Sequence, residues 1–146
     1  MAHPQLHIEQ ARHNEEVANE LVQNPPNHDW GITAAFYAAV HYVESWLFNK
    51  PEKHTETSVP IAGGKLQCSV HAWRLRIVER YLSKAAFNSY QELKAASESA
   101  RYLSLSKPGI FHIPLSILAS EYFHANDAQD MVKDNLETLK KELGIP

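Results

Sequence analysis

The sequence has few of the residues on which several protein classes depend. Its only cysteine is Cys68, so no disulfide can form within the chain and a cysteine-based zinc site cannot be built from this chain alone. Glycine accounts for 5 of 146 residues, whereas an all-β chain needs turn residues about every 8–12 positions. These shortages exclude disulfide-rich, zinc-finger and all-β folds.

Long apolar runs and an excess of positive charge are missing too. The most apolar run, residues 32–40, is about half as long as a membrane-spanning helix needs to be. No stretch near residue 1 has the apolar core of a secretory signal, so we expect a cytoplasmic protein. The formal net charge of -3 lacks the basic bias of a general nucleic-acid binder, although a local cluster can still bind phosphate.

Helical periodicity, by contrast, runs through most of the chain. Apolar residues recur at i, i+3, i+4 and i+7 in the longer segments. A chain of this length buries roughly 68–70% of its unfolded surface, which is enough for one core. We therefore expect residues 1–146 to form a single all-α domain, an antiparallel up-down bundle of four to five helices. The expected helices span about residues 5–23, 30–48, 70–83, 87–100 and 127–143, with a short helix or its beginning at 115–119.

Local signals indicate where these helices begin and end. The segment 24–26, Asn-Pro-Pro, must end the first helix because prolines cannot continue it. Asp29 and Asp127 are the expected N-caps of the second and last helices. Arg101 lies at the end of the fourth helix, where we expect it to hydrogen-bond carbonyls of the last turn.

Residues 49–69 have no helical period and contain two prolines and two glycines. A connection so much longer than the usual 4–6 or so residues is typically functional or mobile. In the helices themselves, we expect Leu6 to face the core. The three tryptophans, Trp30, Trp46 and Trp73, have aliphatic neighbours and are expected to pack in the core rather than to stack on bases.

Three stretches of the sequence stand in a definite order and spacing. They are Trp30-x-x-x-Ala34-Ala35-Phe36-Tyr37-Ala38-Ala39-Val40-His41-Tyr42-Val43-Glu44, then His71-x-x-Arg74, then Tyr90-x-x-Leu93-x-x-x-Ser97-x-x-x-Arg101-Tyr102. Together they resemble the HEPN superfamily of small helical-bundle domains. The resemblance covers roughly residues 28–104, and its most specific parts are the phrases FYAAVHYVE and YQELKAASESARY at their mutual spacing.

The resemblance implies a bundle of four or five helices, commonly a dimer, of a kind found beside nucleotidyltransferases, in toxin–antitoxin pairs and in antiviral defence. Many such proteins are metal-independent ribonucleases, whose signature is an arginine followed, after four to six residues, by a histidine. No arginine of this sequence has a histidine at that distance, and His71 instead precedes Arg74. The missing signature favours a regulatory or interaction module over a ribonuclease.

His71 and Arg74 are the first candidates for chemistry. They lie one helical turn apart and can share a face. We expect both residues and Arg76 to lie away from the apolar stripe of the third helix. A histidine there can accept the proton of a 2′-hydroxyl while the guanidinium binds the scissile phosphate. The alternative is structural: Arg74 pairs with a carboxylate, and His71 caps or hydrogen-bonds within the bundle.

His41 and Tyr37 are the second candidates. They lie one turn apart, with Glu44 three residues beyond His41, and all three could converge with His71 in a cleft. The alternative is a core histidine that hydrogen-bonds beside a tyrosine hydroxyl. His41, Glu44 and His71 could also supply three metal ligands, although no Glu-x-x-His or His-Glu-x-x-His motif accompanies them.

Three functions of different classes follow. The first is an HEPN-like regulatory or interaction module, homodimeric or bound to a partner such as a nucleotidyltransferase, that acts with protein, RNA or a nucleotide. The second is a metal-independent ribonuclease with His71, Arg74, His41 and Tyr37 as catalytic candidates. The third is a metal-binding bundle hydrolase. The first expectation includes no cofactor and no bound metal.

Overall fold

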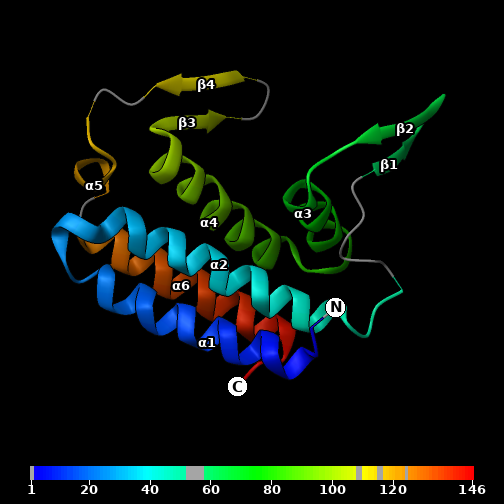
Figure 1. Ribbon diagram of the computed structural model, residues 1–146, viewed down its shortest axis with the longest axis horizontal. Helices are drawn as coiled ribbons and strands as arrows, with labels where there is room; N and C mark the ends of the chain where they lie inside the picture. The colour runs from blue at the N-terminus through cyan, green and yellow to red at the C-terminus, as the bar shows by residue number, and fades with distance from the viewer. Residues whose placement is uncertain (1, 52–57, 108–109, 115–116, 124) are drawn as a thin grey trace.

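Four long helices make up most of the protein (Figure 1). The computed structural model describes residues 2–51, 58–107, 110–114, 117–123 and 125–146. Helix α1 packs on α2, α2 on α4 and on α6, and α4 on α6, so the expected all-α antiparallel bundle is confirmed. None of the described helices is long and apolar enough to cross a membrane. The long helices are α1 (Pro4–Leu21), α2 (His28–Leu47), α4 (Lys84–Tyr102) and α6 (Ala125–Leu143).

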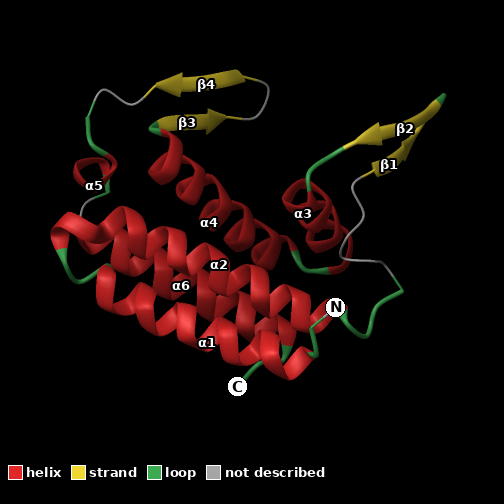
Figure 2. Cartoon of the chain, in the orientation of Figure 1, coloured by secondary structure: helices red, strands yellow, loops and turns green. Residues whose placement is uncertain are grey.

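Shorter elements lie around this bundle. Helix α3 packs against α4, and two β-hairpins lie outside the helical layers, one beyond α3 and one beyond the end of α4 (Figure 2). The shorter elements are η1 (Pro25–Asn27), β1 (Ser58–Ile61), β2 (Gly64–Gln67), α3 (Val70–Tyr81), β3 (Ser104–Lys107), β4 (Ile110–Pro114) and α5 (Ala119–Tyr122).

Both hairpins are absent from the sequence-based expectation. The irregular connection expected over 49–69 contains β1 and β2, which pair antiparallel with Ser58 opposite Gln67, while residues 52–57 lie outside the described part. The other hairpin pairs Ser104 with Pro114. Strands of four or five residues are too short to show a period of two that stands out from its surroundings. The short helix expected near 115–119 begins later, as α5, and residues 115–116 are not described.

The expected N-caps of two helices are wrong, because both aspartates lie inside the first turn. Helix α2 begins at His28 with Asn27 at its N-cap, so Asp29 lies inside the first turn. Asp127 likewise lies in the first turn of α6. An acidic side chain is favourable at either place because the amino end of a helix carries partial positive charge. Helix α1 ends at Leu21, before the two prolines, as expected.

Serine caps fix the two helices that carry most of the candidate site. Ser69 Oγ accepts a hydrogen bond from the backbone N–H of Ala72 at 3.1 Å, at the start of α3. Ser83 Oγ accepts one from Ala86 at 3.2 Å, at the start of α4. Because of this second cap, α4 begins at Lys84 rather than near residue 87.

Small residues on α2 bring its neighbours close to it. Ala35, Ala38 and Ala39 are fully buried. At Gly31 the approach is closest, since a Cβ atom there would lie 2.5 Å from Cγ1 of Val22. The largest fully buried side chains fill the space between the helices, and they include Ile32, Phe36, Tyr42 and Leu47 of α2, Ile77 of α3, Tyr90 and Leu93 of α4, and Leu136 and Leu139 of α6.

Two residues expected in the core are exposed instead. Trp30 is 60% exposed and Leu6 is 57% exposed. Helix α1 buries small side chains, Ala11 and Ala18, so larger apolar residues remain on the outer surface of the α1–α2 layer. Periodicity locates apolar positions but does not tell which of them a neighbouring helix covers. The other two tryptophans pack against the core as expected.

Candidate functional site

A buried ion pair connects α2 with α3. Nε of Arg74 donates to Oε1 of Glu44 at 2.6 Å, and Nη2 contacts the same oxygen. Arg74 is 6% exposed and Glu44 is 3% exposed. We expected Arg74 to lie on the outer side of α3 with Arg76. Arg76 is exposed, but Arg74 is buried and faces the bundle. The structural alternative for Arg74 is confirmed, because a carboxylate on α2 compensates a charge that would be costly to bury alone.

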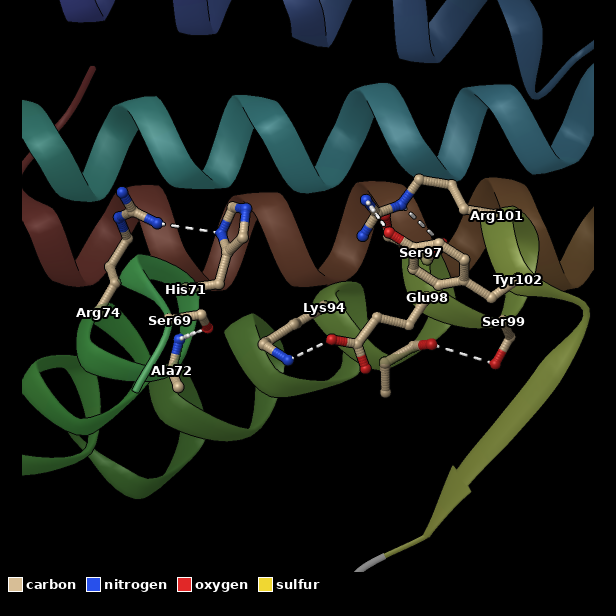
Figure 3. A network of polar contacts seen from close by, with 11 residues as sticks. Ser69, His71, Ala72, Arg74, Lys94, Ser97, Glu98, Ser99, Arg101 and Tyr102 are labelled. Atoms are coloured by element: carbon tan, nitrogen blue, oxygen red, sulfur yellow. Dashed lines mark hydrogen bonds and ion pairs between the residues drawn. The ribbon is translucent and has the colours of Figure 1, made fainter. Parts of the chain in front are cut away.

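His71 hydrogen-bonds to the same guanidinium (Figure 3). Its Nδ1 lies 3.1 Å from Nη1 of Arg74. Arginine can only donate, so Nδ1 accepts, and the neutral imidazole then carries its proton on Nε2. The ring also contacts Phe36 and Tyr37, with centroid distances of 5.4 and 6.2 Å. The structure thus brings His71 together with two of the candidates expected beside it, Arg74 and Tyr37.

Burial and nearby cations keep His71 neutral. Burial lowers the pKa of His71 most, and the charges of Arg74, Lys94 and Arg101 lower it further, while Glu98 raises it. Lys94 and Glu98 form an ion pair one turn apart on α4 (Figure 3). A half-buried neutral ring with cations around it is ready to donate its N–H to an anion.

Arg101 brings positive charge to the surface of this site. Among the described residues no carboxylate forms an ion pair with it. Its Nε donates to the carbonyl of Ser97 at 3.3 Å, as expected for the last turn of α4, and its Nη1 lies 3.4 Å from the hydroxyl of Tyr102. Its guanidinium carbon lies 5.0 Å from the ring centre of Tyr102 and 6.0 Å from that of Tyr37.

The aromatic partner Tyr102 is 65% exposed. It precedes Leu103, which ends α4 in the left-handed conformation with φ 51, the one non-glycine residue of the described chain at positive φ. An arginine stacked on an exposed aromatic ring suits a phosphate with a base beside it. We call His71, Tyr37, Lys94, Arg101 and Tyr102 the His71 site.

His41 lies apart from this site. Its Nδ1 is 2.9 Å from Nδ1 of His7 on α1, and the two half-buried rings have centroids 5.2 Å apart. Burial lowers the pKa of His41 most, the charges of His7 and Arg74 lower it further, and Glu44 raises it. The expected alternative of a hydrogen-bonded histidine is confirmed in kind, but the partner is an imidazole rather than a tyrosine hydroxyl. We call these two residues the His7–His41 pair.

The ligand set of the metal-binding hypothesis is not assembled. Glu44 binds Arg74, His71 accepts from Arg74, and His41 contacts His7. No group of three or more His, Cys, Asp or Glu side chains that could hold a metal ion occurs in the described part of the chain.

Some residues of these sites are not singled out by sequence reasoning. Lys94 and Glu98 do carry a signal, since opposite charges four residues apart on a helix favour a pair. His7 carries none, because its contact with His41 depends on how α1 is aligned against α2. Arg101 is expected as a structural residue, and only the fold places its charge near His71.

Comparison with known proteins gives no match for this chain. No protein-family model matches it, and no curated protein or solved structure matches it significantly. The resemblance to the HEPN superfamily therefore rests on the sequence features given above and stays a prediction.

Proposed function

We propose that this protein is an HEPN-like regulatory or interaction module that binds RNA or a nucleotide through phosphate at the His71 site, without cleaving it. One observation carries the proposal: Nδ1 of His71 accepts a hydrogen bond from Arg74. The bond occupies the basic nitrogen of the neutral ring and leaves an N–H donor at Nε2. A donor suits phosphate oxygens, whereas a general base needs a free lone pair near the 2′-hydroxyl.

The charge around His71 supports the same proposal. Arg74 is compensated by Glu44 and Lys94 by Glu98, which leaves Arg101 as the cation of the site able to meet an anion. A planar guanidinium binds phosphate oxygens through two parallel hydrogen bonds. The exposed ring of Tyr102 beside it offers a stacking surface for a base.

Binding can be tested by fluorescence anisotropy with a labelled single-stranded RNA, competed by ATP. The test variant is Arg101→Gln and the control is Arg76→Gln, which removes the same charge from the exposed side of α3. We expect Arg101→Gln to weaken binding and to reduce the slope of the logarithm of the binding constant against the logarithm of salt concentration by about one. Arg76→Gln should bind much like wild type. Equal losses in both variants, or no binding by wild type, would contradict the proposal.

A ribonuclease is the second candidate, favoured by the lowered pKa of His71, which leaves the ring neutral near pH 7. It requires the bond to Arg74 to open before His71 can accept a proton. The measurement is cleavage of single-stranded and hairpin RNA with and without chelator, beside a His71→Ala/Arg74→Ala variant. We expect no cleavage at concentrations that saturate binding. Cleavage that resists chelator and disappears in the variant would establish the ribonuclease.

The proposal includes a cytoplasmic homodimer or a complex with a partner such as a nucleotidyltransferase. In support, an apolar groove of about 410 Å³ lies between α1 and α2, lined by Val17, Leu21 and Ala34 among others, with the exposed Trp30 beside them. Exposed apolar patches of this kind mark contact surfaces.

Sedimentation equilibrium is expected to give a dimer for wild type and a monomer for Trp30→Ser. The control is Leu118→Ser, which changes an exposed residue outside the groove and should remain a dimer. An unchanged mass for Trp30→Ser would exclude the groove.

A further inference from the structure

A second site lies between α1 and α2, outside the proposed function. His7 and His41 come from different helices of the closely packed α1–α2 layer, and their Nδ1 atoms face each other at 2.9 Å. Two imidazole nitrogens so close, held by separate helices, can converge on one ion once each ring turns about its Cβ–Cγ bond.

We propose that the His7–His41 pair binds one divalent transition-metal ion of the copper, nickel and zinc group, through Nδ1 of each ring. Imidazole nitrogens bind these metals at about 2.0–2.1 Å, so two of them at roughly 90–110° lie about 2.9–3.4 Å apart. The observed 2.9 Å matches the lower end of that range. This is the separation of neighbouring ligands in square-planar or tetragonal coordination, which copper and nickel prefer.

Two protein ligands leave further positions for water. The half-buried rings allow water to reach them, and the described residues supply no third ligand. Glu44 is one turn from His41, and its Oε2 atom is buried with no hydrogen-bond partner among the described residues. That oxygen is suited to accept a hydrogen bond from a metal-bound water, as carboxylates near metal sites do. Arg74 also faces His41, but Glu44 compensates its charge.

The protonation state suits metal binding. In the hydrogen-bonded pair one Nδ1 carries a proton and the other accepts it. On metal binding that proton moves to Nε2 of the same ring, so both Nδ1 atoms present lone pairs and a neutral pair releases no net proton.

Glutamine substitutions separate the metal site from the hydrogen bond, because glutamine still bonds to the remaining histidine but binds these metals poorly. Isothermal titration with Cu²⁺, Ni²⁺ and Zn²⁺ is expected to give one ion per wild-type chain and loss of that binding in His7→Gln and in His41→Gln. The controls are the exposed His3→Gln and His13→Gln, which we expect to bind like wild type. His3 matters most, because this N-cap residue of α1 is four residues before His7 and could chelate a metal with it.

Loss in His3→Gln with binding retained in His41→Gln would place the metal along α1 and overturn the proposal. Binding retained in all four variants would overturn it too. A readout on wild type does not depend on how the variants fold: in nitrogen-15 NMR, Zn²⁺ should shift the Nδ1 resonances of His7 and His41 and leave the other histidines unchanged. Nδ1 resonances that stay in place would equally exclude the site. Neither result depends on RNA binding at Arg101, so this proposal and the proposed function can fail separately.

Discussion

The His71 site and the His7–His41 pair both adjoin one buried ion pair, and we propose ligands of opposite charge for them. Burial is the largest cause of the lowered pKa in both His71 and His41. The neighbours differ. His71 accepts from Arg74 and has further cations around it, so the ring can only donate to an incoming group.

His41 faces another imidazole, and the negative charge of Glu44 raises its pKa. Its pair can therefore share a proton, and in our proposal it binds a metal ion while that proton moves to Nε2. Burial thus favours the neutral form of both histidines, while the hydrogen-bond partner decides whether a ring offers a proton or a lone pair. The Glu44–Arg74 ion pair adjoins both environments, since Arg74 lowers the pKa of both histidines, and it is a polar link between α3 and α2.

We expect the largest effect from removing the carboxylate of the buried ion pair. Glu44→Gln leaves the guanidinium of Arg74 buried without its carboxylate, and we expect a loss of about 3–5 kcal/mol in the free energy of unfolding. Urea denaturation at pH 7 measures it. Glu79→Gln on the exposed side of α3 is the matched control and should change stability by less than about 0.5 kcal/mol.

A loss below about 1 kcal/mol in Glu44→Gln would mean that water reaches Arg74 and compensates its charge. A double variant sharpens the test. Glu44→Leu combined with Arg74→Met removes both charges, and we expect it to be more stable than Glu44→Gln, because no unpaired charge remains buried.

A smaller change should disturb the His41 side alone. In Gly31→Ala the new Cβ would lie 2.5 Å from Cγ1 and 2.9 Å from the backbone nitrogen of Val22, so α1 must shift relative to α2. We expect a net loss of about 1–3 kcal/mol, despite the gain of about 1 kcal/mol in helix propensity. Histidine NMR signals should move for His7 and His41 and stay in place for His71. Movement of all three would show that the two sites respond as one.

The part of this arrangement that the sequence predicts is the part that local chemistry determines. Helix α1 ends before its prolines and α2 carries its apolar spacing, so the bundle is predictable from such signals. The pairing of Arg74 with a carboxylate is predictable only as an alternative, because nothing local identifies Glu44, thirty positions away, as the partner. His7 is missed for the same reason. Only the alignment of α1 on α2 brings it to His41.

The pH dependence of stability is the next smaller effect. Folding lowers the pKa of His71 below its ordinary 6.5, so the contribution is complete above that value and is lost as the pH falls below it toward the folded pKa. We expect the urea concentration at the unfolding midpoint of wild type to decrease as the pH is lowered from about 7 to about 5.5. The midpoint of His71→Gln should decrease less over the same range. His41 acts in the same direction, so some slope should remain. An equal slope in His71→Gln and wild type would refute the expectation.

The smallest effect tests whether the two histidines are electrostatically separate. Lys94 forms an ion pair with Glu98 whose side chains are 18% and 25% exposed, so Lys94→Ala should cost only about 0.3–0.5 kcal/mol. It removes a cation that lowers the pKa of His71 and frees a carboxylate that raises it, so we expect His71 to titrate at higher pH. Lys94 is not among the charges that act on His41, whose titration should stay unchanged in the same NMR experiment. The exposed Lys133→Ala on α6 should move neither histidine. If Lys94→Ala raised the pKa of both His71 and His41, the two histidines would belong to one electrostatically coupled cluster rather than to two independent sites.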